Sequence, residues 1–426
     1  MRKSNKKGFT VVERVIVIAI IAILAGVLIP TFAGLIKKAN TSADIQACRQ
    51  MNEYLAVNEV TDGKNIDSAI KALAEGGMSA KNYKPLSTGC YYFWDSGANR
   101  VVYTSFNNTT KSYDIIYPED FVKQGQWFSL NCEIAKQDYE TPTTSADGVT
   151  TVKIANGGQL AQLISDLKDI QNGKTGVIAG GNFKTKPSTN PKDSPKNLVG
   201  KIIINLTDNI DFGGASFNIN LMEAEFELNG NNHTISGIAN TTGFTQSTNN
   251  SENQLATYGA GLIGYATQSK ITFKNVTIKD SYFGNETVKA SAVFVGQAND
   301  CQITFENTNV NNCTVEGLKG VAIYVGHFRA AVQDHVSSVT FVGTNTANEV
   351  NVIANDSTTN LVAYVIGRTT YDKPITVTGS LNVSNVSLKS HGENISENVY
   401  FVKGNADKYS PVAITTYDGT PLTISQ

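Results

Sequence analysis

Clustered carboxylates, with a basic residue or bound calcium nearby, are what a glycan-cleaving site needs. The candidates in the second half of the chain are Asp208, Asp211, Glu223, Glu225, Glu227, Asp280 and Asp300, with His327, Arg329 and Arg368. They do not recur at one position of a repeat, and most fall at expected turns or strand ends, where Asp is commonly solvated. His233 in GNNHTI also reads as a turn residue. The sequence therefore predicts no catalytic residue, no metal, no cofactor and no enzyme.

Cysteine is the second residue type that could do chemistry. The five cysteines are Cys48, Cys90, Cys132, Cys301 and Cys313. None forms a CxxC pair, so neither a zinc site nor a thioredoxin-like motif is indicated. Disulfides are permitted outside the cytoplasm, and an odd total leaves at least one thiol free or intermolecular.

Glu13 is the third candidate, because it sits in an apolar stretch from Gly8 to Ile36. No charge occurs between Val15 and Ile36, a length that can cross a bilayer core of about 30 Å. An ionised carboxylate in such a segment is costly unless it is paired, which makes it a functional candidate by default. The alternative is that Glu13 lies at the headgroups and is hydrated.

The stretch fits a cleaved secretory signal poorly. The apolar run is longer than a usual signal, and no A-x-A-like site with a polar flank follows Pro30. An uncleaved signal anchor stays open.

Basic residues, then Gly8, Phe9, Thr10 and Glu13, then an aliphatic run with Pro30, resemble the class III leader of type IV prepilins and pseudopilins. The resemblance implies cleavage by a prepilin peptidase between Gly8 and Phe9, and N-methylation of Phe9. It also implies assembly with other pilin subunits, with Glu13 paired to the Phe9 amino group of a neighbour and Pro30 kinking the helix. A membrane-inserted precursor would then become a subunit at the cell surface.

Arg14 departs from this resemblance, whereas the cysteines fit it. Arg14 stands where the family usually has an aliphatic residue. Its guanidinium either snorkels toward cytoplasmic headgroups, in line with the basic N-terminus, or competes for Glu13 and weakens subunit pairing, which would suit a minor subunit. Many pilins carry one disulfide near the C-terminus, which makes Cys90 with Cys132 the preferred pair. Buried free thiols are the equal alternative.

Composition bounds the remainder. The 426 residues leave room for two or three domains, and 41% hydrophobic with 17% charged residues indicates a globular protein beyond the anchor. A net charge of -2 argues against a nucleic-acid partner.

The region 37–140 is expected to be a pilin-like globular part. The helix continues with an apolar stripe until Asp62-Gly63 breaks it, and NIDSAIKALAEGG predicts a second helix. The predicted stripe is Ala43, Ala47, Met51, Tyr54, Leu55 and Val57. CYYFWDSGANRVVYTSF predicts a hairpin of a small sheet, whose aromatic residues fit core packing better than a sugar-stacking surface.

Domain boundaries follow from composition. We expect a leader at 1–8, a membrane or filament-core helix at 9–36, the globular part at 37–140, a mobile linker at 141–150 and a repeat domain at 151–426. At the start of the last part, Leu160, Leu163, Ile164 and Leu167 share one helix face that could cap a stack of strands.

A repeat emerges from residue 255. The segments AGLIG, AVFVG, AIYVG and AYVIG each precede an apolar strand, and Ile271, Ile303, Val339 and Ile375 are spaced by 32, 36 and 36 positions. Units of this size must stack to bury their apolar faces. Asn275 and Asn307 are expected at corners.

The line ELNGNNHTISGI resembles rungs of pectate-lyase-like β-helices and of repeat domains in surface adhesins. The predicted fold class is therefore α+β: a long pilin-like helix with a small antiparallel sheet, then a right-handed parallel β-helix. The expected function is that of a minor type IV pilin or pseudopilin displaying this head to a glycan or protein. The alternatives are a pilin-anchored polysaccharide enzyme and a purely structural pseudopilin of a secretion system.

Overall fold

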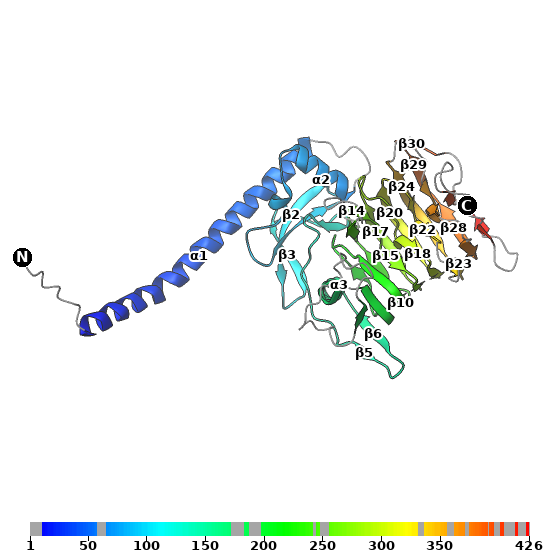
Figure 1. Ribbon diagram of the computed structural model, residues 1–426. Helices are drawn as coiled ribbons and strands as arrows, with labels where there is room; N and C mark the ends of the chain where they lie inside the picture. The colour runs from blue at the N-terminus through cyan, green and yellow to red at the C-terminus, as the bar shows by residue number, and fades with distance from the viewer. Residues whose placement is uncertain are drawn as a thin grey trace, which may run out of the picture.

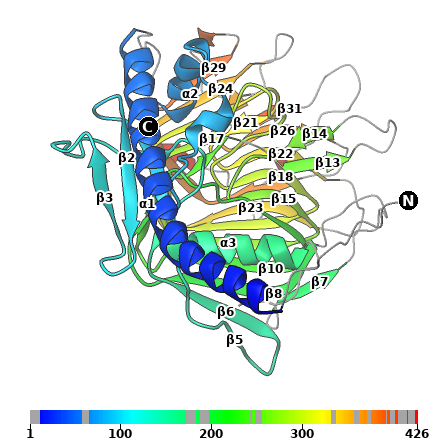
Figure 2. The ribbon, with the colours of Figure 1, turned by 90° about the vertical axis from the view of Figure 1, so that its left-hand side faces the viewer.

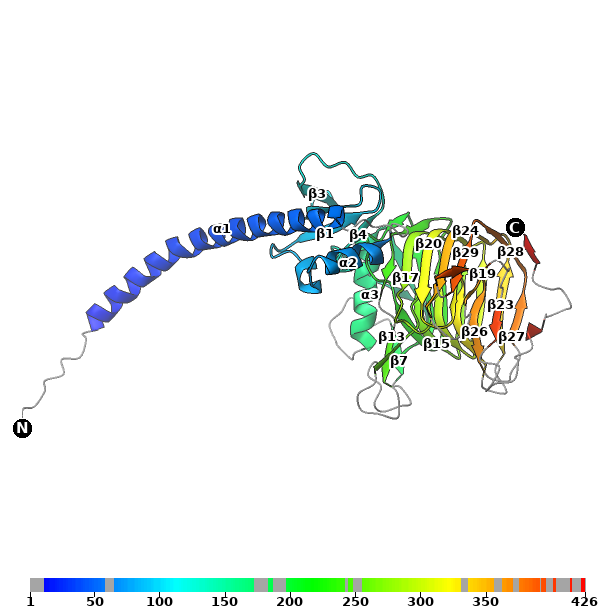
Figure 3. The same ribbon diagram turned by 90° about the horizontal axis from the view of Figure 1, so that it is seen from above.

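The computed structural model describes residues 11–57, 65–171, 183–186, 197–241, 244–247, 255–330, 336–355, 362–370, 375–390, 392–395, 401–403, 414–415 and 423–425. A long helix, α1 (Val11–Val57), projects from a mostly β body (Figure 1). Its first half is apolar, and the helix continues without a break through Pro30. Figure 3 shows that it curves gently toward its N-terminal end.

The second half of α1 packs on a small domain. Helix α2 (Ile66–Glu75) begins at Asn65, whose side chain accepts a hydrogen bond from the Ser68 amide, as a helix cap does. The 3-10 turn η1 (Ala80–Tyr83) leads to a four-stranded antiparallel sheet in the order β3-β2-β1-β4. Its strands are β1 (Cys90–Asp95), β2 (Arg100–Asn107), β3 (Ser112–Tyr117) and β4 (Trp127–Ser129). The predicted second helix and hairpin are thus confirmed.

The aromatic residues of this small sheet form its core. Trp94 and Tyr103 are fully buried against Met51 and Leu55 of α1. Core packing is therefore the role of the buried rings, whereas Tyr91, Phe106, Tyr113 and Tyr117 are partly exposed.

The buried face of α1 overlaps the predicted apolar stripe only in part. Met51 and Leu55 are buried and Ala47 and Tyr54 are partly buried, but Ala43 and Val57 are exposed. The residues that continue the buried stripe toward the N-terminus are Asp44 and Cys48. The apolar pattern could not indicate Asp44, because the burial of its carboxylate depends on hydrogen-bond donors outside the helix.

The rest of the chain is mostly β, with a large and mainly parallel sheet. From residue 263 the chain visits three columns of strands in a constant order, and each strand pairs in parallel with its counterpart on the next visit. The first column holds β15 (Ile263–Thr267), β18 (Val295–Asn299), β22 (Val325–Arg329), β26 (Ile366–Thr370) and β31 (Phe401–Lys403). The second holds β16 (Lys270–Lys274), β19 (Gln302–Glu306), β23 (Ser337–Val342), β27 (Ile375–Thr378) and β32 (Ile414–Thr415). The third holds β17 (Thr277–Gly284), β20 (Asn309–Gly317), β24 (Thr346–Ala354), β28 (Ser380–Ser384) and β29 (Ser387–Ser390).

Earlier strands start these columns and short ones decorate them. The starting strands are β6 (Val149–Ile154), β8 (Asn197–Leu206), β9 (Ile210–Asp211), β10 (Ile219–Asn229), β11 (Thr234–Ser236) and β12 (Ala239–Asn240). The short ones are β5 (Thr143–Thr144), β7 (Lys184–Lys186), β21 (Val321–Ala322), β25 (Val362–Ala363), β30 (Glu393–Asn394), β33 (Thr423–Ser425) and the antiparallel pair β13 (Phe244–Ser247) and β14 (Leu255–Tyr258). We call all the strands from β6 onward the stack.

The predicted repeat register holds for two steps and then shifts. Ile271 pairs with Ile303, and Ile303 with Val339. Val339 then pairs with Val377, whereas Ile375 lies opposite Ser337. The shift of two residues keeps the same side chains inward, because side chains alternate with period two, so the apolar pattern could not detect it.

The interior of the stack is a ladder of aromatic rings. Phe273, Phe305 and Phe341 occupy successive strands of the second column, with ring centroids 5.6 and 5.3 Å apart. At the next corner Asn275 and Asn307 adopt positive φ, and the Asn307 amide donates to the Asn275 side-chain oxygen at 2.9 Å. The predicted corner positions of these two residues are confirmed.

Helix α3 (Gly157–Gln171) covers the first end of the stack, as expected. Leu160, Leu163, Ile164 and Leu167 are buried in the same cluster as β8 and β10. Figure 2, which looks from the α1 side, shows α1 and α3 in front of the columns.

The segment 141–150 differs from the predicted mobile linker. Thr143 and Thr144 pair with Thr151 and Thr150, so this segment turns back as a hairpin between β5 and β6. Phe93, Val102 and Trp127 of the small sheet also share one buried cluster with the stack. The two parts therefore pack on each other. A polar, Thr-rich composition indicated a turn, but it could not reveal contacts made by residues elsewhere.

Candidate assembly surface

The first half of α1 is the exposed apolar surface of the described chain. Its side chains from Val11 to Ile36 are mostly exposed, and none of its most apolar 18-residue window, of mean hydropathy 2.9, is buried in the body. Such a helix is long and apolar enough to cross a membrane. A solvent-exposed surface of this kind needs lipid or other helices to cover it.

Two of the predicted assembly residues lie on this surface and two lie outside the described residues. Glu13 is in the first turn of α1, where a carboxylate is favoured by the helix dipole, and Pro30 is inside the helix. Gly8 and Phe9 precede the described residues. Arg14 follows Glu13 and is exposed. Because successive residues of a helix point about 100° apart, Glu13 and Arg14 of one chain do not face each other.

Asp44, which the sequence reasoning missed, ties α1 to the small domain. Its side chain is 2% exposed and accepts hydrogen bonds from the amides of Leu86 and Ser87 at 2.7 and 3.0 Å. The Tyr103 hydroxyl donates to the same carboxylate at 3.0 Å, and the Tyr92 hydroxyl donates to the backbone carbonyl of Asp44 at 2.9 Å. Three donors therefore satisfy a buried carboxylate that would otherwise be costly. The only signal in the sequence is that Asp44 lies four residues before Cys48 and seven before Met51.

Asn52 adds a second polar tie one turn beyond Cys48. Its amide group exchanges hydrogen bonds with the backbone of Val101, at 2.7 and 2.9 Å. The strand β2 is thereby fixed along the helix, so the direction of α1 relative to the small sheet is set by specific bonds.

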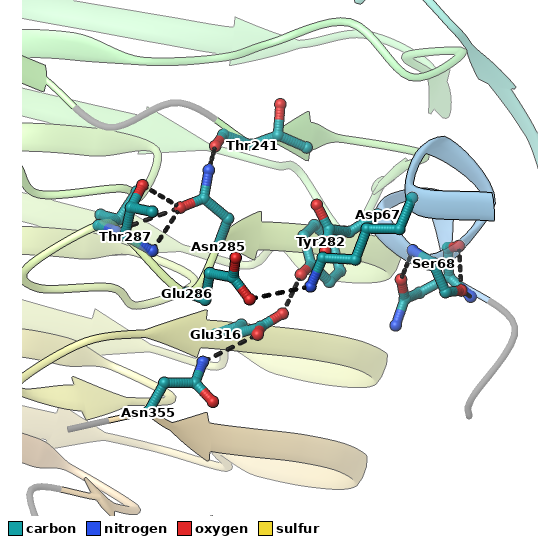
Figure 4. Close-up of polar contacts among 12 residues, drawn as sticks. Asp67, Ser68, Thr241, Tyr282, Asn285, Glu286, Thr287, Glu316 and Asn355 are labelled. Atoms are coloured by element: carbon teal, nitrogen blue, oxygen red, sulfur yellow. Dashed lines mark hydrogen bonds and ion pairs between the residues drawn. The ribbon is translucent and has the colours of Figure 1, made fainter. Parts of the chain in front are cut away.

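A polar cluster joins α2 to the stack (Figure 4). Lys71 forms ion pairs with Asp67 at 3.0 Å and with Glu286 at 3.2 Å, and the Tyr282 hydroxyl donates to Glu316. Burial raises the pKa of Asp67, although Lys71 opposes this effect. Since Lys71 and Glu286 are about half exposed, their pair contributes little stability and mainly fixes orientation.

The predicted cysteine pair is not joined. Cys90 and Cys132 are free thiols, and the Cys132 sulfur lies 3.9 Å from the Thr241 hydroxyl oxygen. Cys48, Cys301 and Cys313 are buried free thiols whose pKa is raised to about 12 by desolvation.

Three of the carboxylates considered for chemistry are ion-paired with lysines. Asp211 pairs with Lys123 at 3.2 Å, Glu225 with Lys270 at 3.8 Å, and Asp280 with Lys279 at 3.4 Å. Glu223, Asp280 and Asp300 adopt positive φ at bends, and His233 sits in a turn closed onto Gly230. Within the described ranges no group of three or more His, Cys, Asp or Glu side chains could hold a metal ion.

Three of the basic candidates do come together in the first column. His327 lies in register with Gln297 on one side and Arg368 on the other. Desolvation first, then Arg368 and Arg329, lower the pKa of His327 to about 3, so the imidazole is neutral. A neutral imidazole beside two cations is a packing element of this face.

Comparison with known proteins adds one match. Residues 3–29 match the family model of the prokaryotic N-terminal methylation motif. The match covers part of the expected leader and most of the exposed half of α1. It includes no residue of the small domain or of the stack. No curated protein and no solved structure matches the chain.

Proposed function

We propose that this chain is a pilin-like or pseudopilin-like subunit that a prepilin peptidase processes and that assembles through α1 while displaying the stack. The observation that carries the proposal is the methylation-motif match at 3–29, which falls on a helix whose apolar half is exposed. A prokaryotic leader of this type is consistent with a membrane-anchored precursor.

Glu13 is the proposed register residue of assembly. In a continuous helix its carboxylate occupies a defined position five residues after the expected cleavage site, within reach of the amino terminus of a neighbouring helix. Pairing there would remove the cost of a charge in the apolar region.

The head is proposed to be a right-handed parallel β-helix that serves adhesion or binding at the cell surface, as a minor subunit of a filament. Its support is the constant three-column order of strands and the aromatic ladder inside them. We also propose that the head is not an enzyme, because three of the acidic candidates are already ion-paired with lysines.

Mass spectrometry of the mature N-terminus tests processing. Coexpression with a prepilin peptidase should yield a chain that starts at N-methylated Phe9, and Gly8→Val should leave the precursor uncut. A wild-type chain that keeps Met1, or one cut after residue 30, would contradict the proposal. Thr10→Ser is the matched control, since it changes the same region but retains Gly8.

A further inference from the structure

A cleft lies where the small domain meets the third column of the stack. The cleft has a volume of about 520 Å³ and lies between the start of α2, the loops after β1 and before β4, and the strands β17 and β20. This volume is in the range of about 300–1,000 Å³ that is usual for small-molecule sites. Segments more than 150 residues apart in sequence form it. We call it the junction cleft.

The lining of the junction cleft is mostly amide and hydroxyl groups. Its amides are Asn65, Gln124, Gln126 and Asn312, and its hydroxyls include Ser96 and Thr314. The Asn65 oxygen accepts from the Ser68 amide and the Gln126 nitrogen donates to Asp211, so these two groups are engaged within the protein. Gln124 and Asn312 supply the amides that we match to the vicinal hydroxyls of a sugar, since an amide both donates and accepts. Phe128, which is 6% exposed, supplies the accessible apolar surface of the lining, and Ile66 packs beneath it without exposed surface.

The two charges at the cleft are compensated from outside it. Lys123 pairs with Asp211 at 3.2 Å, and Asp280 pairs with Lys279 at 3.4 Å. A ligand with its own charge would have to displace these pairs. Because each charge has an opposite charge beside it, the lining carries no net charge and offers most of its contacts through neutral groups, which fits a neutral ligand better than an acidic or sulfated one.

The walls of the cleft are fixed before any ligand arrives. The buried Asp95 carboxylate accepts from the amides of Gly97 and Ala98 at 2.9 Å each and from the Gln124 amide at 2.8 Å. The Trp127 indole donates to it at 3.0 Å. The two loops also touch, since a Cβ on Gly125 would lie 2.2 Å from the Gly97 nitrogen. Fixed walls reduce the ordering cost of binding.

A line of side-chain amides leaves the cleft along the stack. Asn312 donates to Asp280 at 2.7 Å, Asn348 donates to Asn311 at 3.3 Å, and Asn385 donates to Asn348 at 3.0 Å. Positive φ recurs at this corner at Asp280, Asn312, Glu349 and Asn385, so two carboxylates alternate with the amides there. A chain of several sugar units could follow it.

A peptide fits the same place less well. Strand addition requires a free strand edge. The strands β17 and β20 beside the cleft are paired on both edges, with β11 and β20 and with β17 and β24.

We propose that the junction cleft binds a neutral oligosaccharide, with one sugar unit in the cleft and further units along the amide line. The inference rests on the proposed display function for its biological purpose, because a displayed head needs a ligand.

Binding of the full-length protein in detergent to immobilised oligosaccharides tests the inference. The probes are neutral chains of glucose, galactose, mannose and N-acetylglucosamine, beside uronate-containing and sulfated chains. We expect binding to one or more neutral chains. Their failure to bind, or binding to charged chains alone, would overturn the proposal, and so would binding to peptides only.

Variants then locate the binding site. The double variant Gln124→Ala/Asn312→Ala should weaken binding of the strongest neutral chain at least tenfold in calorimetry. The exposed amide Gln46 on α1 supplies the matched control, since Gln46→Ala should leave affinity unchanged. A double variant with wild-type affinity, at an unchanged unfolding midpoint, rejects the cleft as the site.

The two proposals fail separately. A methylated Phe9 terminus without glycan binding removes the cleft and leaves the display function. Neutral-glycan binding by a chain that keeps Met1 removes pilin-like assembly and leaves the cleft.

Discussion

At the scale of single residues, Asp44 has the largest expected effect on stability. It brings a carboxylate into the contact between α1 and the small sheet, where the Tyr103 hydroxyl group and two backbone amides donate to it. Removing the Asp44 carboxylate would leave those buried donors without a hydrogen-bond acceptor.

We predict that Asp44→Ala lowers the free energy of unfolding by about 3 kcal/mol, since several charge-assisted hydrogen bonds are lost together. Urea unfolding of the full chain in detergent, followed by tryptophan fluorescence, measures the change. The neighbouring exposed Ala43→Ser is the control and should shift unfolding by less than about 0.5 kcal/mol. A small effect of Asp44→Ala would show that water replaces the carboxylate.

His327 gives the head a defined dependence on pH. Its folded pKa of about 3 lies below the ordinary value of 6.5, so the unfolded chain binds a proton that the folded chain excludes. Stability is thus present above pH 6.5 and is lost as the pH falls toward 3.

Between pH 7 and pH 5 this proton linkage should lower the free energy of unfolding by about 2 kcal/mol. His327→Gln should remove that part of the dependence of stability on pH. The measurement is the urea midpoint at both pH values for the two proteins. His233, in an exposed turn region of the stack, supplies the comparison variant His233→Gln. Equal slopes for wild type and His327→Gln would mean that the imidazole is protonated in the folded state.

At the scale of elements, the repeated glycines explain why one motif recurs. Gly296, Gly326 and Gly367 stand where neighbouring backbones touch, and a Cβ on them would lie 2.5, 2.6 and 2.3 Å from backbone atoms. Each glycine is the second residue of a strand, because β18, β22 and β26 begin one residue before Gly296, Gly326 and Gly367.

We expect Gly326→Ala to destabilise the head by about 2 kcal/mol, because the added methyl group must push two backbones apart. The thermal unfolding midpoint of the full chain records it. Gly34→Ala in α1 has nothing within 4 Å of the added atom and should leave the head unchanged. If the two variants unfold alike, the close approach is not a constraint.

Glu13 and Arg14, which are neighbours in α1, are expected to have different roles. Arg14 points about 100° away from Glu13 on the same helix, which favours snorkelling over competition.

Accordingly, Arg14→Leu should keep incorporation into filaments within about twofold of wild type, whereas Glu13→Leu should abolish it. Immunoblots of sheared filaments, normalised to the membrane pool, give the ratio. A several-fold rise with Arg14→Leu would instead support competition for Glu13.

At the scale of the whole molecule, the small domain and the stack share one buried cluster. The chain's two tryptophans, Trp94 and Trp127, both belong to the small sheet, so their fluorescence follows that part alone. A mobile joint at 141–150 would let the two parts unfold independently.

We predict coincident unfolding of the two parts in urea, because neither buries its contact surface alone. Tryptophan fluorescence and hydrogen exchange of β16, β19 and β23 should give one midpoint. Phe93→Ala, in the shared cluster, should lower both together. An earlier fluorescence transition would restore the independent-domain view.

Local patterns in the sequence were sufficient for the elements. Helical spacing predicted α2 and α3, turn residues predicted the β1–β2 hairpin, and glycine and asparagine punctuation predicted the repeat with its register as far as Val339. The apolar length and the Gly8, Phe9 and Glu13 spacing also determined the expected route of assembly. These features depend on residues that are neighbours along the chain.

Only the tertiary structure decided which surfaces meet. It placed Asp44 in the core and shifted the register at Val377. It also turned the expected joint into a packed contact and assembled the junction cleft from residues between Asn65 and Thr314. Pairing across such distances depends on shape and on partners elsewhere in the chain. A one-dimensional pattern fixes the period of a face, whereas the fold fixes what that face touches.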